Sequence, residues 1–271
     1  MNKKIKKLLA LLGIITVAVA IIATVRNENN FSLNGFSANN FNSVSLSELK
    51  NDGRVIFNNS MLLVNSEHPL PDNFIADIKQ FEDTDAYLDS SAVDSFSIIR
   101  EAVNQKFGKK LLIMSSYRST DDQKRIYKSE GKKLAAVPGT SEHETGLGID
   151  VYVKYFAGKG FIKSDEGKFV NEYCGEYGFI IRYPKYRKHI TGYSYEPWHI
   201  RYVGKPHSKI ISDNDITLEE YLDSLKPGKF YLYDGYVISK QSGDMLKIPE
   251  SFKSAVVSSD NCGNYIVTVK L

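Results

Sequence analysis

The sequence predicts an α+β domain with a small, mainly antiparallel sheet flanked by helices, followed by a small β appendage. Residues 89–107 place apolar side chains along one helical face, and residues 147–153 alternate between apolar and polar positions as a strand does. After residue 226 the chain changes to short strand-like runs joined by Gly, Asp and Asn turns. These three patterns define the predicted fold class.

The first 26 residues begin with lysines and continue as an uncharged, mostly apolar run over 8–25. A run of this length is a candidate membrane span, and the positive-inside rule keeps its N-terminus cytoplasmic. A cleaved signal peptide is the alternative, because Ala18 and Ala20 could form a small-residue cleavage site. We therefore expect residues 1–26 to be a single-pass membrane anchor or a signal segment. In both cases the rest of the chain is outside the cytoplasm.

Residues 27–53 are rich in Asn and Ser and are interpreted as a spacer. The main domain is expected over 54–226. Its clearest element is the helix 89–107, which carries Ala92, Phe96, Ile99 and Val103 on one face and ends at Gly108.

Further elements of the main domain follow from shorter patterns. They are a short helix after "HPLPDNF", a buried strand at 111–116, a helix capped by Thr120 and Gln123, the strand 147–153, a helix near 165–177, a strand near 179–183 and a last helix capped by Thr217 and Glu220. On the strand 147–153, Leu147, Ile149 and Val151 share one face, and Gly148, Asp150 and Tyr152 share the other. Residues 227–271 form the predicted appendage, which at this size should pack on the main domain.

Composition excludes several classes of protein. Of the 271 residues, 42% are hydrophobic and 25% are charged, which is typical of a globular protein. The net charge of +3 is too small to indicate nucleic-acid binding. Two cysteines are too few for a disulfide framework; Cys174 is interpreted as a buried free thiol, and a bridge to Cys262 stays an alternative.

Two of the five histidines lie beside acidic residues in a pattern that indicates a metal site. "TSEHETGLGID" holds His143 and Asp150, and "YEPWHIRY" holds Glu196 and His199. A catalytic zinc ion takes three protein ligands and leaves one position for water, whose pKa falls towards about 7. The sequence predicts His143, Asp150 and His199 as ligands.

Two further residues would complete a hydrolytic site. Glu196 lies three residues before His199 and can act as a general base without being a ligand. Arg118 follows the buried strand 111–116 in "SSYRS", and its guanidinium can stabilise negative charge on a carbonyl oxygen. Singly, each of these residues has an ordinary structural interpretation, and the prediction depends on the joint pattern. Glu142 and Glu144 are interpreted as exposed loop residues.

These motifs resemble those of the zinc D,D-peptidases that include VanY, VanX and VanXY. "SEHETGLGID" matches the family's S-x-H-x-x-G-x-A/G-x-D motif, "EPWH" its E-x-W-H motif and "SSYRS" its S-x-Y/F-R-S motif, in the same order. The resemblance runs from about residue 60 to about 225 and is most specific to the VanY D-alanyl-D-alanine carboxypeptidases. It leaves the appendage without an assigned role.

The resemblance implies a zinc peptidase acting on peptidoglycan stem peptides outside a bacterial membrane. It implies zinc at His143, Asp150 and His199, and it adds Ser141 and Gln123 as residues that hold the terminal carboxylate of the substrate. Gly148 departs from the usual alanine, a change expected to leave room and do little harm. The biological setting would resemble glycopeptide resistance or wall maturation.

Three rival functions are weighed against this prediction. Fragments of serine D,D-peptidase motifs occur, such as "SELK" and "SDN", but they lack the required spacing and helical context. A non-catalytic peptidoglycan-binding module would be favoured if Glu196 or a ligand were missing, and none is. Within the family, an L,D-carboxypeptidase or a D-Ala-D-Ala dipeptidase stays open, because the shape of the pocket decides between them.

Overall fold

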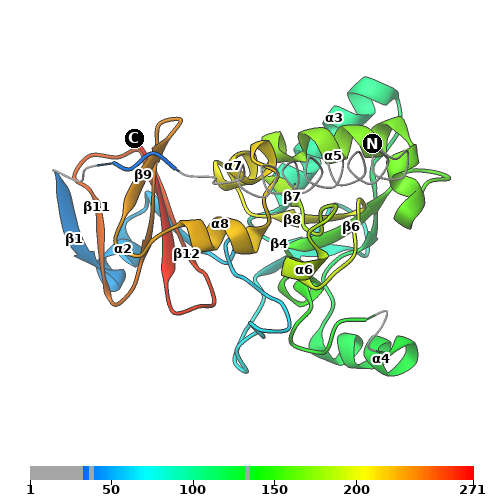
Figure 1. The fold of residues 1–271 in the computed structure, drawn as a ribbon, viewed down its shortest axis with the longest axis horizontal. Helices are drawn as coiled ribbons and strands as arrows, with labels where there is room; N and C mark the ends of the chain where they lie inside the picture. Colours follow the sequence, from blue (N-terminus) through cyan, green and yellow to red (C-terminus); the bar gives the residue numbers. More distant parts are fainter. Residues whose placement is uncertain (1–32, 37–39, 132–134) are drawn as a thin grey trace, which may run out of the picture. The chain divides into compact units, whose positions relative to one another are not determined.

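The computed structural model describes residues 33–36, 40–131 and 135–271, of which Asn34–Leu271 belong to one compact unit. This unit contains a four-stranded and a five-stranded sheet, each with its own cluster of buried hydrophobic residues (Figure 1). The predicted anchor or signal segment, residues 1–26, lies outside the described residues. Within the described ranges, no helix is both long and apolar enough to cross a membrane.

The four-stranded sheet is antiparallel throughout and has the strand order β5-β6-β8-β7. Its strands are β5 (Leu112–Ser115), β6 (Gly148–Tyr152), β7 (Phe179–Ile181) and β8 (His199–Tyr202). Helices α3 (Val93–Phe107) and α5 (Asp165–Tyr173) lie side by side and cover one face of it (Figure 1). The buried cluster between helices and sheet includes Phe96, Ile99, Val103, Val170, Ile149, Val151 and Ile200. The predicted fold class is therefore confirmed, with the polar face of β6 turned away from this core.

Helix boundaries follow the sequence signals with two shifts: α3 begins at Val93 instead of residue 89, and the cap of α4 (Thr120–Glu130) moves by one residue. Helix α3 ends at Gly108, whose φ of 65° is in the left-handed region that favours glycine. The sequence predicts Thr120 and Gln123 as the caps of helix α4. Its capping box is instead formed by Ser119 and Asp122, because the Ser119 hydroxyl accepts the Asp122 amide and the Asp122 carboxylate reaches back.

The later helices agree with the prediction, and the first short helix does not. Helix α8 (Leu218–Ser224) has the predicted box of Thr217 and Glu220. Helix α5 continues into the 3₁₀ helix η3 (Cys174–Tyr177). The "HPLPDNF" segment forms turns without a helix; its prolines lack amide donors, and Leu70 N donates instead to Gly139 O at 2.7 Å.

The second sheet has the order β2-β12-β13-β10-β9 and is joined by a two-stranded sheet, β1-β11. Its elements are β1 (Phe41–Ser45), α2 (Leu46–Asn51), β2 (Val55–Asn58), β9 (Phe230–Tyr233), β10 (Tyr236–Gln241), β11 (Met245–Pro249), β12 (Ser254–Ser259) and β13 (Tyr265–Lys270). The strands predicted in the appendage are present. The interpretation of 27–53 as a spacer is wrong from residue 41 onward, because β1 pairs with β11 and Leu49 of α2 is buried in this second core.

Specific polar contacts connect the two sheet regions. Met61 N donates to Ser258 Oγ at 2.9 Å, and Leu63 N donates to Asp260 O at 3.2 Å. His207 is buried between them: its Nδ1 lies 2.7 Å from Tyr221 Oη, and its Nε2 lies 2.7 Å from Thr268 Oγ1.

The remaining elements are β3 (Ile78–Gln80), β4 (Tyr87–Asp89), η1 (Glu142–Thr145), η2 (Gly158–Lys163), α6 (Lys188–Thr191) and α7 (His207–Asp213).

Both cysteines are free thiols. Cys174 is buried in the core beneath α3 and α5, and burial raises the pKa of its thiol to about 12. Cys262 is exposed. The interpretation of Cys174 as a buried thiol is confirmed, and the alternative bridge to Cys262 is not formed.

Candidate metal centre and active site

The polar face of the four-stranded sheet brings the three predicted ligands together. Asp150 on β6 and His199 on β8 are register partners across the antiparallel pair, so their side chains leave the same face. His143 comes from η1, the 3₁₀ helix just before β6. Gly146 ends η1 at a φ of 75°, and a Cβ there would lie 2.7 Å from Asp89 N, so glycine is required for this return into the strand.

The donor atoms of these residues converge on one point. His199 Nδ1 lies 2.9 Å from Asp150 Oδ1, and His143 Nε2 lies 3.4 Å from Asp150 Oδ2. Each residue offers one ligand atom, and the three atoms lie within 4.8 Å of one another. His143 Nδ1 donates to Ser116 O at 2.9 Å, which leaves Nε2 for a metal. Two imidazoles and one carboxylate are a donor set that suits zinc.

The charge of the Asp150 carboxylate also suits a cation. Burial raises the pKa of Asp150, but His143 and His199 outweigh it and hold that pKa well below its usual range. Burial lowers the pKa of His143, which favours the neutral ring. Burial likewise lowers the pKa of His199, but hydrogen bonds to Asp150 and Glu142 prevail and raise it to about 9. The centre therefore presents a charged carboxylate between His143, which favours its neutral ring, and His199, whose proton a metal ion would have to displace.

Glu196 lies beside the centre and is not among its three possible ligands. It lines the same cavity of about 260 Å³ as His143, Asp150 and His199. Its backbone is fixed on both sides, since Glu196 N donates to Tyr183 O at 3.0 Å and Glu196 O accepts from His199 N at 3.1 Å. Burial raises the pKa of its carboxyl, so the group is closer to neutral pH than an exposed glutamate.

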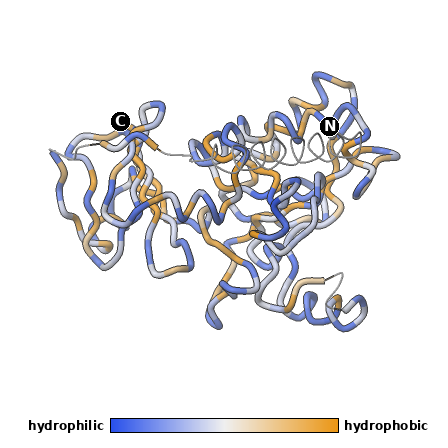
Figure 2. Tube along the Cα trace, in the orientation of Figure 1, coloured by the Kyte–Doolittle hydropathy of each residue, from blue (hydrophilic) through white to orange (hydrophobic). Residues whose placement is uncertain are grey.

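Arg118 also lines this cavity and lies in the segment between β5 and α4. Its backbone N donates to His143 O at 3.1 Å, its Nε to Gln123 Oε1 at 3.1 Å and its Nη1 to Ser115 Oγ at 2.9 Å. Gln123 also donates to Ala136 O at 2.8 Å and is the one buried residue of α4, a helix whose residues are mostly hydrophilic (Figure 2). Both polar ends of the Gln123 amide are thus engaged, and the residue holds Arg118 in place.

Ser141 is buried directly before η1 and lines the cavity with the ligands. Ser141, Arg118 and Glu196 thus line one cavity with the three ligands, and Gln123 contacts this group through Arg118. Trp198 also lines the cavity and packs against the main core.

The two glutamates interpreted as exposed loop residues are buried, which corrects that expectation. Glu144 accepts from Gly139 N at 2.8 Å through Oε2. Glu142 pairs with two fully buried arginines, Arg182 and Arg201, and approaches His199. A signal was available in the sequence: each arginine directly follows an isoleucine within an apolar strand-like run, where a charged side chain requires a buried partner.

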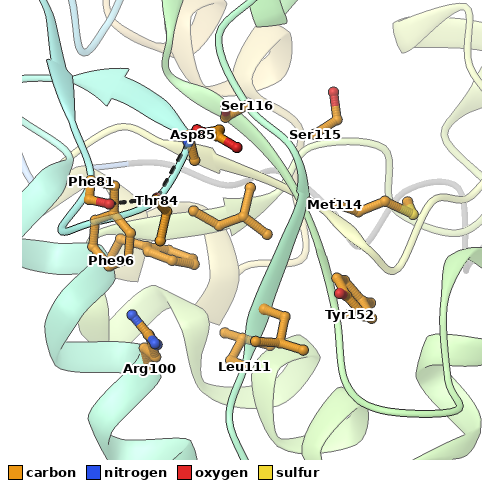
Figure 3. A pocket seen from close by; sticks show the side chains of 13 residues that line it. Phe81, Thr84, Asp85, Phe96, Arg100, Leu111, Met114, Ser115, Ser116 and Tyr152 are labelled. Atoms are coloured by element: carbon orange, nitrogen blue, oxygen red, sulfur yellow. Dashed lines mark hydrogen bonds between the residues drawn. The ribbon is translucent and has the colours of Figure 1, made fainter.

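Another cavity, of about 330 Å³, lies along β5 on the side of Phe81 and Arg100 (Figure 3). It is lined mainly by apolar side chains, among them Leu111 and Met114, together with Tyr152. None of the predicted site residues lines it. The candidate active site is therefore the polar cavity at the metal centre.

Three possible ligands with a separate carboxylate in one cavity are the arrangement that a metal-dependent hydrolase uses. Residues 85–205 match the family model of VanY, D-alanyl-D-alanine carboxypeptidase. A D-alanyl-D-alanine carboxypeptidase of Enterococcus faecium is 32% identical over 239 residues, covering 79% of this chain and 76% of the relative.

Two solved structures are also similar to this chain. A mutant of the vancomycin resistance D,D-pentapeptidase VanY from a VanB-type resistance cassette, in complex with Zn(II), is 31% identical with a TM-score of 0.53, covering 60% of this chain and 98% of its own. The LdcB LD-carboxypeptidase is 38% identical with a TM-score of 0.55, covering 60% of this chain and 86% of its own. The chain belongs to the VanY family of metallopeptidases.

Proposed function

We propose that this protein is a zinc-dependent D,D-carboxypeptidase that removes the C-terminal D-alanine from peptidoglycan precursor peptides ending in D-Ala-D-Ala. The observation that carries the proposal is the convergence of His143, Asp150 and His199, with Glu196 beside them and outside the ligand set. A cavity built in this way can hold a cation, an attacking water and a peptide carbonyl together. Membership of the VanY family supports the substrate class.

Zinc would be held by His143 Nε2, by the Asp150 carboxylate and by His199 Nδ1. When bound, the ion supplies a Lewis acid that polarises the scissile carbonyl and lowers the pKa of water. Glu196 accepts the proton of the attacking water and later delivers it to the leaving amine. The raised pKa of Glu196 suits both steps, since a carboxyl that titrates nearer to neutral pH can release the proton it has taken.

Arg118 stabilises the negative charge that develops on the carbonyl oxygen. The side chain is half-buried, and burial lowers its pKa from the usual arginine value, yet a guanidinium stays protonated. Its Nε and Nη1 are held by Gln123 and Ser115, which fixes the direction of the planar group. We propose that Ser141 contacts the terminal carboxylate of the substrate and that Gln123 contributes by positioning Arg118.

An L,D-carboxypeptidase is the second candidate, favoured by the 38% identity to the LdcB LD-carboxypeptidase. That enzyme class cuts after an L-residue of a shorter stem peptide. A D-Ala-D-Ala dipeptidase or a non-catalytic peptidoglycan-binding module would use the same cavity differently. One experiment separates all four.

The test is mass spectrometry of purified muropeptides incubated with the zinc-loaded protein. Peptides ending in D-Ala-D-Ala should lose one alanine, while peptides ending in a single D-Ala should stay intact. The reverse result would establish L,D-specificity. Faster cleavage of free D-Ala-D-Ala than of muropeptides would indicate a dipeptidase, and no cleavage of any substrate would contradict enzymatic function.

We also propose that residues 1–26 hold the protein at the bacterial membrane, with the rest of the chain outside the cytoplasm. Support comes from the uncharged run over 8–25, from the lysines before it and from the extracytoplasmic location of the proposed substrate. Residues 41–58 would then belong with 227–271 to a small β lobe beside the peptidase domain.

Deletion of residues 1–26 tests this anchor. The full chain should fractionate with membranes, whereas a chain starting at Asn27 should be soluble and should keep its hydrolytic activity, because the described elements begin beyond it. Native protein found mainly in the culture medium and trimmed near Ala20 would show that the segment is a cleaved signal.

A further inference from the structure

The carboxylate of Glu142 is fully buried between His199 and two arginines. Its Oε1 accepts from Arg182 Nε at 2.6 Å and from Arg201 Nη1 at 2.7 Å, and the side chains of all three residues have no exposed surface. With Oε1 taken by the arginines, Oε2 is directed at His199 Nε2, 3.4 Å away. The carboxylate is thus fixed by one oxygen and faces the imidazole with the other.

The ring of His199 is held in one orientation. Its Nδ1 faces Asp150 Oδ1 at 2.9 Å on the side of the metal ligands, and its Nε2 faces Glu142. The ring of Tyr183 packs against it, with centroids 4.9 Å apart and planes 35° from parallel. A flipped ring would turn a carbon towards each carboxylate, so both contacts select the observed orientation.

We propose that Glu142 is a positioning residue for the metal: it accepts the Nε2–H of His199, and so fixes the tautomer and direction in which Nδ1 is presented as a ligand. A histidine ligand whose other nitrogen donates to a carboxylate is a stronger and better oriented ligand. The inference rests on the proposed metal role of His143, Asp150 and His199.

Gly148 lies directly beside the contact between Glu142 and His199. A Cβ at this position would lie 3.0 Å from Glu142 Cβ and 3.1 Å from His199 Nε2, which is tighter than ordinary contact. The expectation that the glycine leaves spare room is therefore wrong: the space it leaves is filled by the two side chains that meet there. An added methyl group would press on the contact between Glu142 and His199 without removing any charge.

Two arginines keep Glu142 in place from behind. Arg182 also donates to Glu219, with Nη1 and Nη2 at 2.9 and 2.6 Å from its two carboxylate oxygens. Arg201 donates to Ser60 O at 3.1 Å and to Leu62 O at 2.8 Å, in the segment that follows β2. Glu219 therefore belongs to the same buried ion-pair group but does not contact the metal ligands, which makes it a matched control.

The test compares zinc affinity, measured by competition with a chromophoric chelator, in the wild type, Glu142→Gln and Glu219→Gln. Glu142→Gln should bind zinc about 10- to 100-fold more weakly, the usual effect of removing an outer-shell partner. Glu219→Gln removes a carboxylate from the same group and should lower the melting temperature while keeping the zinc affinity. In Co²⁺-loaded protein, the visible absorption bands should change in Glu142→Gln and stay unchanged in Glu219→Gln.

Zinc affinity within about twofold of the wild type in folded Glu142→Gln would overturn the inference, since it falls well short of the usual effect of an outer-shell partner. Equal loss of zinc in the two variants would also overturn it, because the effect would then follow from general destabilisation. If Glu142→Gln does not fold, Glu142→Asp replaces it. That variant keeps the negative charge beside the two arginines but shortens the side chain by one methylene, which draws the carboxylate away from His199. It should bind zinc about tenfold more weakly, the lower end of the usual effect of an outer-shell partner, and unchanged affinity in it would overturn the inference.

This design separates the inference from the proposed function. Failure of the proposed function would appear in the wild type, as absence of zinc binding or of muropeptide cleavage. Failure of the inference would appear instead in the Glu142 variants, as zinc affinity equal to that of the wild type or as a loss equal to that in Glu219→Gln.

Discussion

His143→Ala and His199→Ala are expected to lose stoichiometric zinc and, with it, hydrolysis of peptides ending in D-Ala-D-Ala. Each substitution removes one of the three atoms that converge within 4.8 Å. The loss of affinity should exceed the roughly 10- to 100-fold typical of outer-shell substitutions, since a ligand itself is removed. The hydrophobic cluster between α3, α5 and the sheet is untouched, so both variants should fold. Metal analysis, circular dichroism and product assay on the same samples provide the measurement.

The control for these variants is His189→Ala, which removes an exposed histidine on α6, away from the three ligands. It should keep zinc and activity. A chelator should inactivate the wild type, and added zinc should restore it. Full activity of metal-free wild-type protein would contradict the metal-dependent mechanism.

Local patterns predict the elements whose structure depends on neighbours in sequence. The apolar face of α3 and the alternation along β6 are visible over a few residues, and both predictions lie within a few residues of the observed bounds. Capping is less exact, because Ser119 and Thr120 both carry a hydroxyl and the sequence does not show which one precedes the first turn.

Long-range pairing explains what the sequence did not predict about the fold. Strand β1 pairs with β11 and β2 pairs with β12, about 200 residues further along the chain. The segment 27–53 is rich in Asn and Ser and lacks a strong apolar period, so its own composition indicates a spacer. Its order from residue 41 onward comes from the partner strands and from the core that they share.

The site was predictable as far as motifs reach. His143, Asp150, His199, Glu196 and Arg118 lie around one cavity, as the spacing of the motifs indicated. The burial of Glu142 depends on two arginines: Arg201 on β8 is 59 positions away, and Arg182, the residue after β7, is 40 positions away. Such a partner set is assembled by the sheet, which is why the two glutamates on either side of His143 were predicted to lie on the surface.

Glu196→Gln is expected to keep zinc and the fold while losing roughly 10²- to 10⁴-fold in kcat, the usual contribution of general acid–base catalysis. The glutamine side chain has nearly the same size as that of glutamate, and the backbone contacts of residue 196 with Tyr183 and His199 do not involve the side chain. The glutamine amide, however, does not accept a proton from water. Zinc content and kinetics measured on one preparation test the prediction, and loss of zinc would mean that Glu196 is a ligand.

A pH profile gives the same prediction a second readout. The base must be deprotonated to act, and burial raises the pKa of Glu196 above the usual 4.5. In the wild type, kcat/KM should therefore fall as pH decreases through a value above 4.5, and this acidic limb should be absent from the residual activity of Glu196→Gln.

Glu130→Gln is the matched comparison, because Glu130 lines the same cavity from the end of α4 and its loss removes the same charge. Glu142 is a poor alternative base: burial would raise its pKa, but Arg182 and Arg201 hold it well below the usual range. We expect Glu130→Gln to stay within about tenfold of the wild type, far above the activity of Glu196→Gln. The opposite order, with near-normal turnover in Glu196→Gln and a large loss in Glu130→Gln, would assign the base to Glu130 and place the attacking water on the α4 side of the cavity.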